Sequence, residues 1–149
     1  MPIVSLSRAV SGLLTVQLLA VVWAVAFRLP YQFGGHGASD GIFRDLWTRG
    51  TALSAPIVFL AVFPVALVIA RQHGPRGILG TAAILALSLV ALVAGAKEPA
   101  VWEALHGGFP PLARGGILVF SGMSLLAALV TVVAAVMRLG RRQTQPRES

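Results

Sequence analysis

Four stretches of this 149-residue chain contain no Asp, Glu, Lys, Arg or His. They cover residues 9–27, 51–70, 77–96 and 115–137, and every charged residue lies between or beyond them. A helix of about 20 apolar residues, rising roughly 1.5 Å per residue, crosses a hydrocarbon core of about 30 Å. The pattern therefore predicts an integral membrane protein with four transmembrane helices.

Composition supports this class and excludes several others. Charged residues make up only 11% of the chain, against about 25% in soluble domains. The net charge of +7 does not indicate a nucleic-acid partner, because the basic residues bracket the apolar stretches and do not alternate with aromatic residues. The chain has no cysteine, which excludes disulfides, thiolate metal sites and cysteine catalysis.

The expected fold is an all-α, four-helix membrane bundle that forms a single domain over residues 1–138. Residues 139–149 are predicted to form a basic, disordered cytoplasmic tail. An orientation with both termini inside places more basic residues in the cytoplasm, including the short 71–76 loop. The expected location is the plasma membrane of a bacterium. One alternative is a signal peptide cleaved after residues 24–26, which would leave three spans.

The fourth span carries a row of small residues at alternating intervals of three and four: Ser121, Ser124, Ala128, Thr131 and Ala135. Such a row lets another helix approach closely, so this face is predicted to pack inside the bundle. Larger apolar side chains are then expected to face lipid or another subunit: Leu125, Leu129, Val132 and Val136.

The two longer loops, expected outside the cell, resemble each other. Each is predicted to form a short helix with an apolar face, made by Ile42, Phe43, Leu46 and Trp47 in the first and by Val101, Trp102 and Leu105 in the second. Ser39-Asp40 is expected to cap the first helix, and Pro99 to lie in the first turn of the second. Both helices are expected to lie at the outer headgroup level, with tryptophan as the anchor.

The same loops hold the carboxylates that would be catalytic if the protein is an enzyme: Asp40, Asp45, Glu98 and Glu103. Partial burial at the membrane boundary disfavours the charged form of a carboxyl group, so a paired carboxyl there would suit general acid or base work on a lipid-soluble substrate. The alternative is that these groups form surface ion pairs, Asp45 with Arg49 and Asp40 with Arg44.

Four further residues are candidates for ligand binding. Gln17 is the strongly polar residue of the first span and needs a hydrogen-bond partner, either another helix or a ligand. Trp47 and Trp102 are predicted to wall a cavity, and Gln17 or His106 would donate a hydrogen bond to a quinone. Because every histidine lies in a loop, a haem held by two histidines is not expected, and we predict no metal or cofactor.

The function predicted from these features is that of a non-enzymatic accessory subunit or a binder of an apolar small molecule. Charge-free spans argue against proton-coupled transport, which requires ionisable groups within the bilayer. The expected partners are the lipid bilayer, a lipophilic small molecule, and another protein or a second copy bound through apolar faces. Two alternatives stay open: a membrane-embedded isomerase or cyclase that uses the outer acids, and a quinone-interacting subunit of a redox complex.

Overall fold

The computed structural model describes residues 5–30, 32 and 41–143, and these residues fold into helices without a β-strand. The elements are α1 (Leu6–Ala26), α2 (Ile42–Thr48), α3 (Ile57–Ala70), α4 (Gly74–Ala96), α5 (Pro99–Leu105) and α6 (Pro111–Gln143). The prediction of an all-α fold is confirmed.

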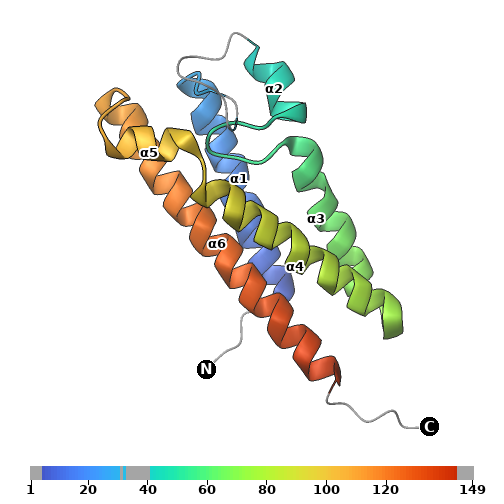
Figure 1. The fold of residues 1–149 in the computed structure, drawn as a ribbon. Helices are drawn as coiled ribbons and strands as arrows, with labels where there is room; N and C mark the ends of the chain where they lie inside the picture. Colours follow the sequence, from blue (N-terminus) through green and yellow to red (C-terminus); the bar gives the residue numbers. More distant parts are fainter. Residues whose placement is uncertain (1–4, 31, 33–40, 144–149) are drawn as a thin grey trace, which may run out of the picture.

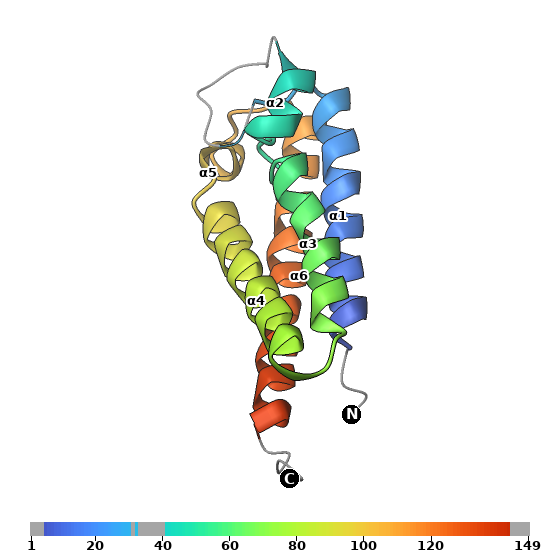
Figure 2. The same cartoon turned by 90° about the vertical axis from the view of Figure 1, so that its right-hand side faces the viewer.

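Four helices, α1, α3, α4 and α6, run lengthwise beside one another, and α2 and α5 lie together at one end (Figures 1 and 2). Helix α6 packs on α1 and α4, and α3 packs on α4. We call the end with α2 and α5 the α5 end. The opposite end, which holds the start of α1, the α3–α4 turn and the end of α6, is called the α3–α4 end.

Within the described part of the chain, three helices are long and apolar enough to cross a membrane: α1, α4 and α6. Large apolar side chains are exposed on the outside of these helices, including Leu19, Val93 and Leu126. A soluble protein would bury such surface, whereas lipid covers it at no cost. These helices support the prediction of a transmembrane-helix protein.

The second predicted span, 51–70, is helical only from Ile57 onward. Pro56 is the N-cap residue of α3. Residues 51–54, which were predicted to be the start of this helix, form a buried turn. Within this turn the Thr51 N–H donates to the Ser54 carbonyl at 2.9 Å, and the Thr51 hydroxyl accepts from the Ser54 N–H at 3.2 Å. Hydropathy alone missed this because hydroxyl side chains compete for backbone groups and proline supplies no N–H.

Other boundaries also differ from the predicted ones. Helix α4 begins at Gly74, and α6 continues to Gln143, so residues 139–143 of the predicted tail are helical. Residues 144–149 lie outside the described part of the chain. The two predicted loop helices are present as α2 and α5, and Gly41 is the N-cap residue of α2. The predicted cap, Ser39-Asp40, lies outside the described residues.

Small residues of α6 lie in the packed interior of the bundle, beside large apolar side chains such as Phe63 and Ile84. In the predicted row on α6, Ser124 is half-buried and the other four residues are buried: Ser121, Ala128, Thr131 and Ala135. The prediction that Leu125 faces lipid or another subunit is wrong, because Leu125 is half-buried against Gly95 of α4. A leucine beside a glycine fills the space that the missing side chain leaves.

Candidate ligand-binding site

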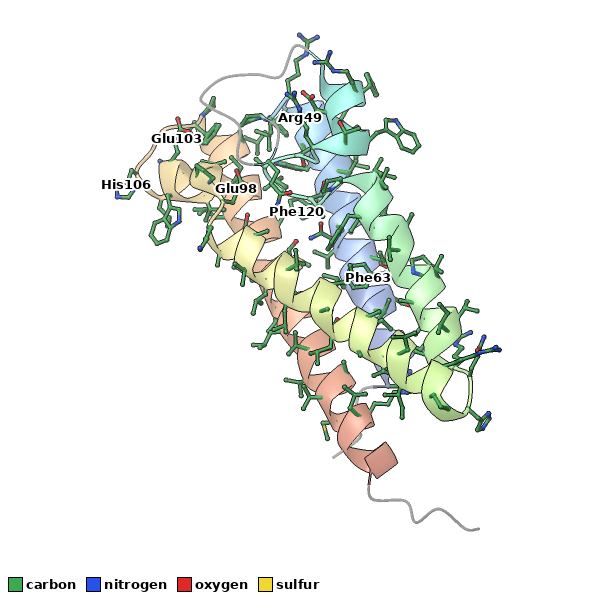
Figure 3. All side chains as sticks on the ribbon, turned by 45° about the vertical axis from the view of Figure 1, so that its right-hand side comes forward. Arg49, Phe63, Glu98, Glu103, His106 and Phe120 are labelled. Carbon is green, nitrogen blue, oxygen red and sulfur yellow. The ribbon has the colours of Figure 1, made fainter. Side chains whose placement is uncertain are left out.

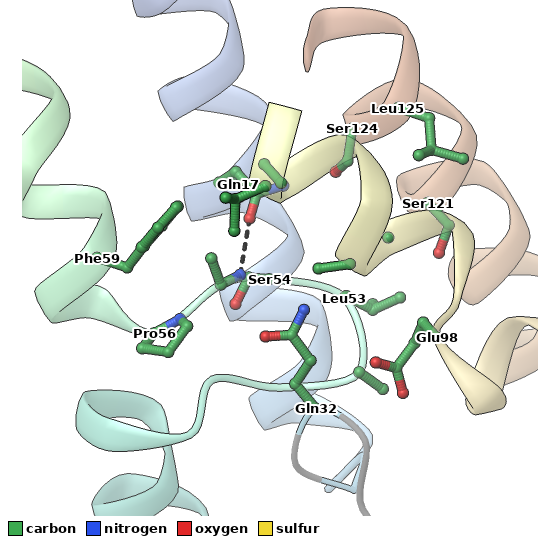
Figure 4. Close-up of a pocket in the computed structure, with 16 residues that line it drawn as sticks. Gln17, Gln32, Leu53, Ser54, Pro56, Phe59, Glu98, Ser121, Ser124 and Leu125 are labelled. Carbon is green, nitrogen blue, oxygen red and sulfur yellow. Dashed lines mark hydrogen bonds between the residues drawn. The ribbon is translucent and has the colours of Figure 1, made fainter. Parts of the chain in front are cut away.

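A cavity of about 100 Å³ lies between the long helices near the α5 end (Figure 4). Helices α1, α3, α4 and α6 contribute to its wall, together with residues 52–56. Its polar lining consists of Gln17, Gln32, Ser54, Glu98, Ser121 and Ser124. The sequence placed the candidate acids in the outer loops, whereas this cavity lies inside the bundle, and of the candidate site residues Gln17 and Glu98 line it.

Glu98 brings a carboxyl group into the cavity. Helix α4 ends at Ala96 and α5 begins at Pro99, so only two residues connect them. In this short connection Lys97 is exposed, while Glu98, the N-cap residue of α5, is only 2% exposed. Its side chain makes no capping hydrogen bond to α5 and instead lines the cavity (Figures 3 and 4).

Gln17 joins the first helix to the non-helical turn. Its amide oxygen accepts a hydrogen bond of 3.0 Å from the Ala55 N–H, and its side chain is buried. This bond satisfies a backbone donor that precedes α3 and would otherwise have no helical partner. The hydrogen-bond partner that the sequence required for Gln17 is therefore a loop backbone group (Figure 4).

Two serines of α6 complete the polar wall. Ser121 is buried, and the Ser124 hydroxyl oxygen is buried with no hydrogen-bond partner among the described residues. A buried hydroxyl without a partner is costly, so this group is available to a water molecule or a ligand. Their spacing along α6 predicted helix packing for both serines and did not indicate a place in a cavity wall. The one signal in the sequence was that the row carries hydroxyl groups at Ser121 and Ser124, where alanine would have packed as closely.

The other candidate carboxylates do not join Glu98. Asp45 is buried in α2, where its carboxylate lies 3.9 Å from the Arg49 guanidinium and 4.0 Å from that of Arg44. The predicted pair of Asp45 with Arg49 is confirmed. Glu103 lies on α5 beyond the cavity wall, and Asp40 lies outside the described residues. Of the three candidate carboxylates that the structure describes, Glu98 alone lines the cavity.

The two predicted wall tryptophans point to the surface. Trp47 on α2 is 58% exposed and Trp102 on α5 is 56% exposed, so neither lines the cavity. The aromatic side chain in the wall is Phe59 of α3. His106 is exposed at the end of α5, with its Nδ1 2.7 Å from the Trp102 carbonyl oxygen (Figure 3).

The cavity lining determines what it can hold. A carboxyl group, amide groups and hydroxyls are suited to hydrogen-bond donors and to cations. Among the described residues, no group of three His, Cys, Asp or Glu side chains is placed to hold a metal ion. The volume of about 100 Å³ is well below the roughly 300 Å³ of a small drug-binding pocket. The cavity by itself is therefore too small to enclose a drug-sized molecule.

Comparison of the chain with protein-family models, with curated proteins and with solved structures finds no match. The function is therefore inferred from the residues of this chain alone.

Proposed function

We propose that this protein is a four-span membrane protein that binds a lipophilic small molecule by its hydrogen-bond-donating or cationic end. The observation that carries the proposal is the buried Glu98 carboxyl, which lines one cavity with Ser121, Ser124 and Gln17. A carboxyl group kept inside an apolar bundle is expensive and persists mainly for function. Its natural ligand group is an amine or a hydroxyl.

The proposed topology has α3 as a span, with both termini in the cytoplasm. Helix α3 is about 21 Å long at 1.5 Å per residue, which is short of a full crossing. The remaining depth is supplied by residues 51–56, whose turn is buried by protein. Irregular backbone at membrane depth is tolerated when protein buries it. Arginines at the α3–α4 end, including Arg71 and Arg76, support a cytoplasmic position for that end.

The size of the cavity requires that most of the ligand lies elsewhere. Val90 of α4 lines the cavity and is 55% exposed on the outer face of the bundle. In a membrane that face contacts acyl chains. The ligand therefore places its polar end beside Glu98 and passes its apolar chain out beside Val90 into the lipid.

The cavity lining contains one of the candidate carboxyl groups, Glu98, and this favours binding over catalysis. Acid and base work by paired carboxylates needs two of them near the substrate, and Asp45 is held by arginines away from Glu98. A quinone site using His106 is disfavoured by the position of this residue at the protein surface. The accessory-subunit function is compatible with the same site, with a partner covering the exposed apolar faces.

The test compares two glutamates five positions apart. Glu98→Gln and Glu103→Gln remove the same charge, but only Glu98 lines the cavity. Each protein is purified in lipid nanodiscs, and its bound small molecules are identified by mass spectrometry. Binding of a long-chain primary amine and of a carboxylate of the same chain length is then measured.

We expect wild type and Glu103→Gln to bind the amine more tightly than the carboxylate. Glu98→Gln is expected to lose about tenfold in amine affinity, the effect of about 1.4 kcal/mol from one charge-assisted hydrogen bond. Circular dichroism establishes that both variants are folded. Equal amine affinity in the two variants, or no preference in wild type, would refute the proposal.

A further inference from the structure

A second, apolar groove runs between α1 and α6 toward the α3–α4 end. It has a volume of about 300 Å³, and its apolar lining includes Ala9, Gly12, Val16, Met123, Leu126 and Val130. Arg8 also lines this groove and lies in the first turn of α1. The groove is separate from the Glu98 cavity, with which it shares no lining residue.

Gly12 creates the open space in this groove. A β-carbon at position 12 would meet no atom within 4 Å, so the glycine is not required for contact between helices. Across the groove, Leu126 is 63% exposed. The walls are thus apolar and open to the membrane, as expected for a surface that a hydrocarbon chain covers.

Charge at the α3–α4 end favours an anionic occupant. Arg71 donates a hydrogen bond of 3.1 Å to the Ser7 hydroxyl, which brings a second guanidinium to the first turn of α1, the turn that also holds Arg8. The charged residues at this end of the described chain are all arginines, among them Arg8, Arg71, Arg76, Arg138 and Arg141. The described carboxylates, Asp45, Glu98 and Glu103, belong to α2 and α5 or adjoin them at the opposite end.

We propose that this groove binds an anionic phospholipid. One acyl chain lies between α1 and α6 over Gly12, and the phosphate contacts Arg8, with Arg71 adding positive charge. The stretch of α1 from Arg8 to Val16 is about 12 Å long, which is within the roughly 15 Å depth of one leaflet. In the proposed orientation this is the cytoplasmic leaflet, where anionic lipids attract basic residues near the surface.

The test uses the full chain, reconstituted in vesicles of equal parts phosphatidylglycerol and phosphatidylcholine. The protein is extracted in mild detergent, and the lipids that stay bound are counted by native mass spectrometry. Gly12→Leu fills the groove, and Gly122→Leu is its matched control on α6, because position 122 also has no neighbour within 4 Å of a β-carbon. Arg8→Gln removes the phosphate contact, and Arg76→Gln is its control at the same end of the bundle.

Wild type, Gly122→Leu and Arg76→Gln are expected to retain phosphatidylglycerol in preference to phosphatidylcholine. Arg8→Gln is expected to lose about fivefold in phosphatidylglycerol retention, the factor that corresponds to about 1 kcal/mol per basic residue at the surface. Gly12→Leu is expected to lose the bound lipid while keeping its helical circular dichroism spectrum. Equal retention of the two lipids by wild type would overturn the proposal. So would equal lipid retention by Gly12→Leu and Gly122→Leu.

Discussion

Polar groups from three distant parts of the chain meet in the interior of the bundle near its α5 end. Gln17 comes from α1, Ser124 from α6, and Glu98 from the α4–α5 connection. Each has a desolvation cost that its surroundings must offset. Gln17 offsets it with the Ala55 backbone, whereas the Ser124 hydroxyl has no partner in the described chain. At this scale, Gln17 stabilises the fold and the serine is the group open to a ligand.

We predict that Gln17→Leu destabilises the protein by about 1–2 kcal/mol, because it leaves the Ala55 N–H without its acceptor. The control is Thr15→Val on the same helix, since the Thr15 hydroxyl donates only to the Ser11 carbonyl, which already accepts within the helix. Denaturant unfolding in mixed micelles measures both. If Gln17→Leu proves as stable as Thr15→Val, the hydrogen bond to Ala55 contributes nothing to folding.

At the scale of elements, α3 and α4 owe their close contact to Gly80. A β-carbon at position 80 would lie 2.7 Å from the Ile69 carbonyl carbon and 2.8 Å from the Ala66 carbonyl oxygen. The atoms in the way are backbone, which cannot turn aside as a side chain can. The Arg138 guanidinium donates a 2.8 Å hydrogen bond to the Ala70 carbonyl and ties α6 to the end of α3. The short helix α3 is therefore held by its neighbours at the α3–α4 end.

We therefore expect Gly80→Ala to destabilise the bundle by about 1–3 kcal/mol, because the added methyl group pushes α3 away from α4. Gly122→Ala adds the same methyl group where no atom lies within 4 Å. It should be neutral or stabilising by up to about 1 kcal/mol, since alanine favours helix. Thermal unfolding in the same detergent compares them. A Gly80→Ala variant as stable as Gly122→Ala would contradict the close backbone approach.

At the scale of the whole molecule, charge is distributed unevenly between the two ends. The described charged residues of the α3–α4 end are all arginines, whereas the α5 end carries the described acids together with basic residues such as Arg44, Arg49 and Lys97. The start of α1 and the end of α6 lie at the same end of the bundle (Figure 2). The four crossings that we propose would place both on the same side of the membrane, and by the positive-inside rule the proposed side is the cytoplasm.

The absence of cysteine from the chain permits a direct test of this topology. His73 in the α3–α4 turn and His106 after α5 are both exposed, so His73→Cys and His106→Cys are a matched pair at opposite ends. We expect a membrane-impermeant thiol reagent to label His106→Cys in intact cells. His73→Cys should react only after permeabilisation. The reverse pattern would contradict the proposed orientation or the crossing by α3.

Particular residues show how far sequence reasoning reaches. The row from Ser121 to Ala135 was correctly placed in the interior, because helical periodicity depends only on spacing along the chain. The same periodicity placed Leu125 on the lipid side, and the structure places it against Gly95. What a residue on the flank of a helix touches depends on the rotation of that helix relative to its neighbour. A single sequence does not contain that rotation.

The sequence by itself determined the helical class, the apolar stretches and the two short loop helices. Each of these follows from local hydrophobicity, helix period and proline position. Only the tertiary structure decided that Glu98 turns inward, that residues 51–54 form a buried turn, and that Gln17 binds the Ala55 backbone. The physical reason is that these outcomes arise from groups far apart in the chain. Whether a buried polar group is satisfied depends on which distant partner the packing brings to it.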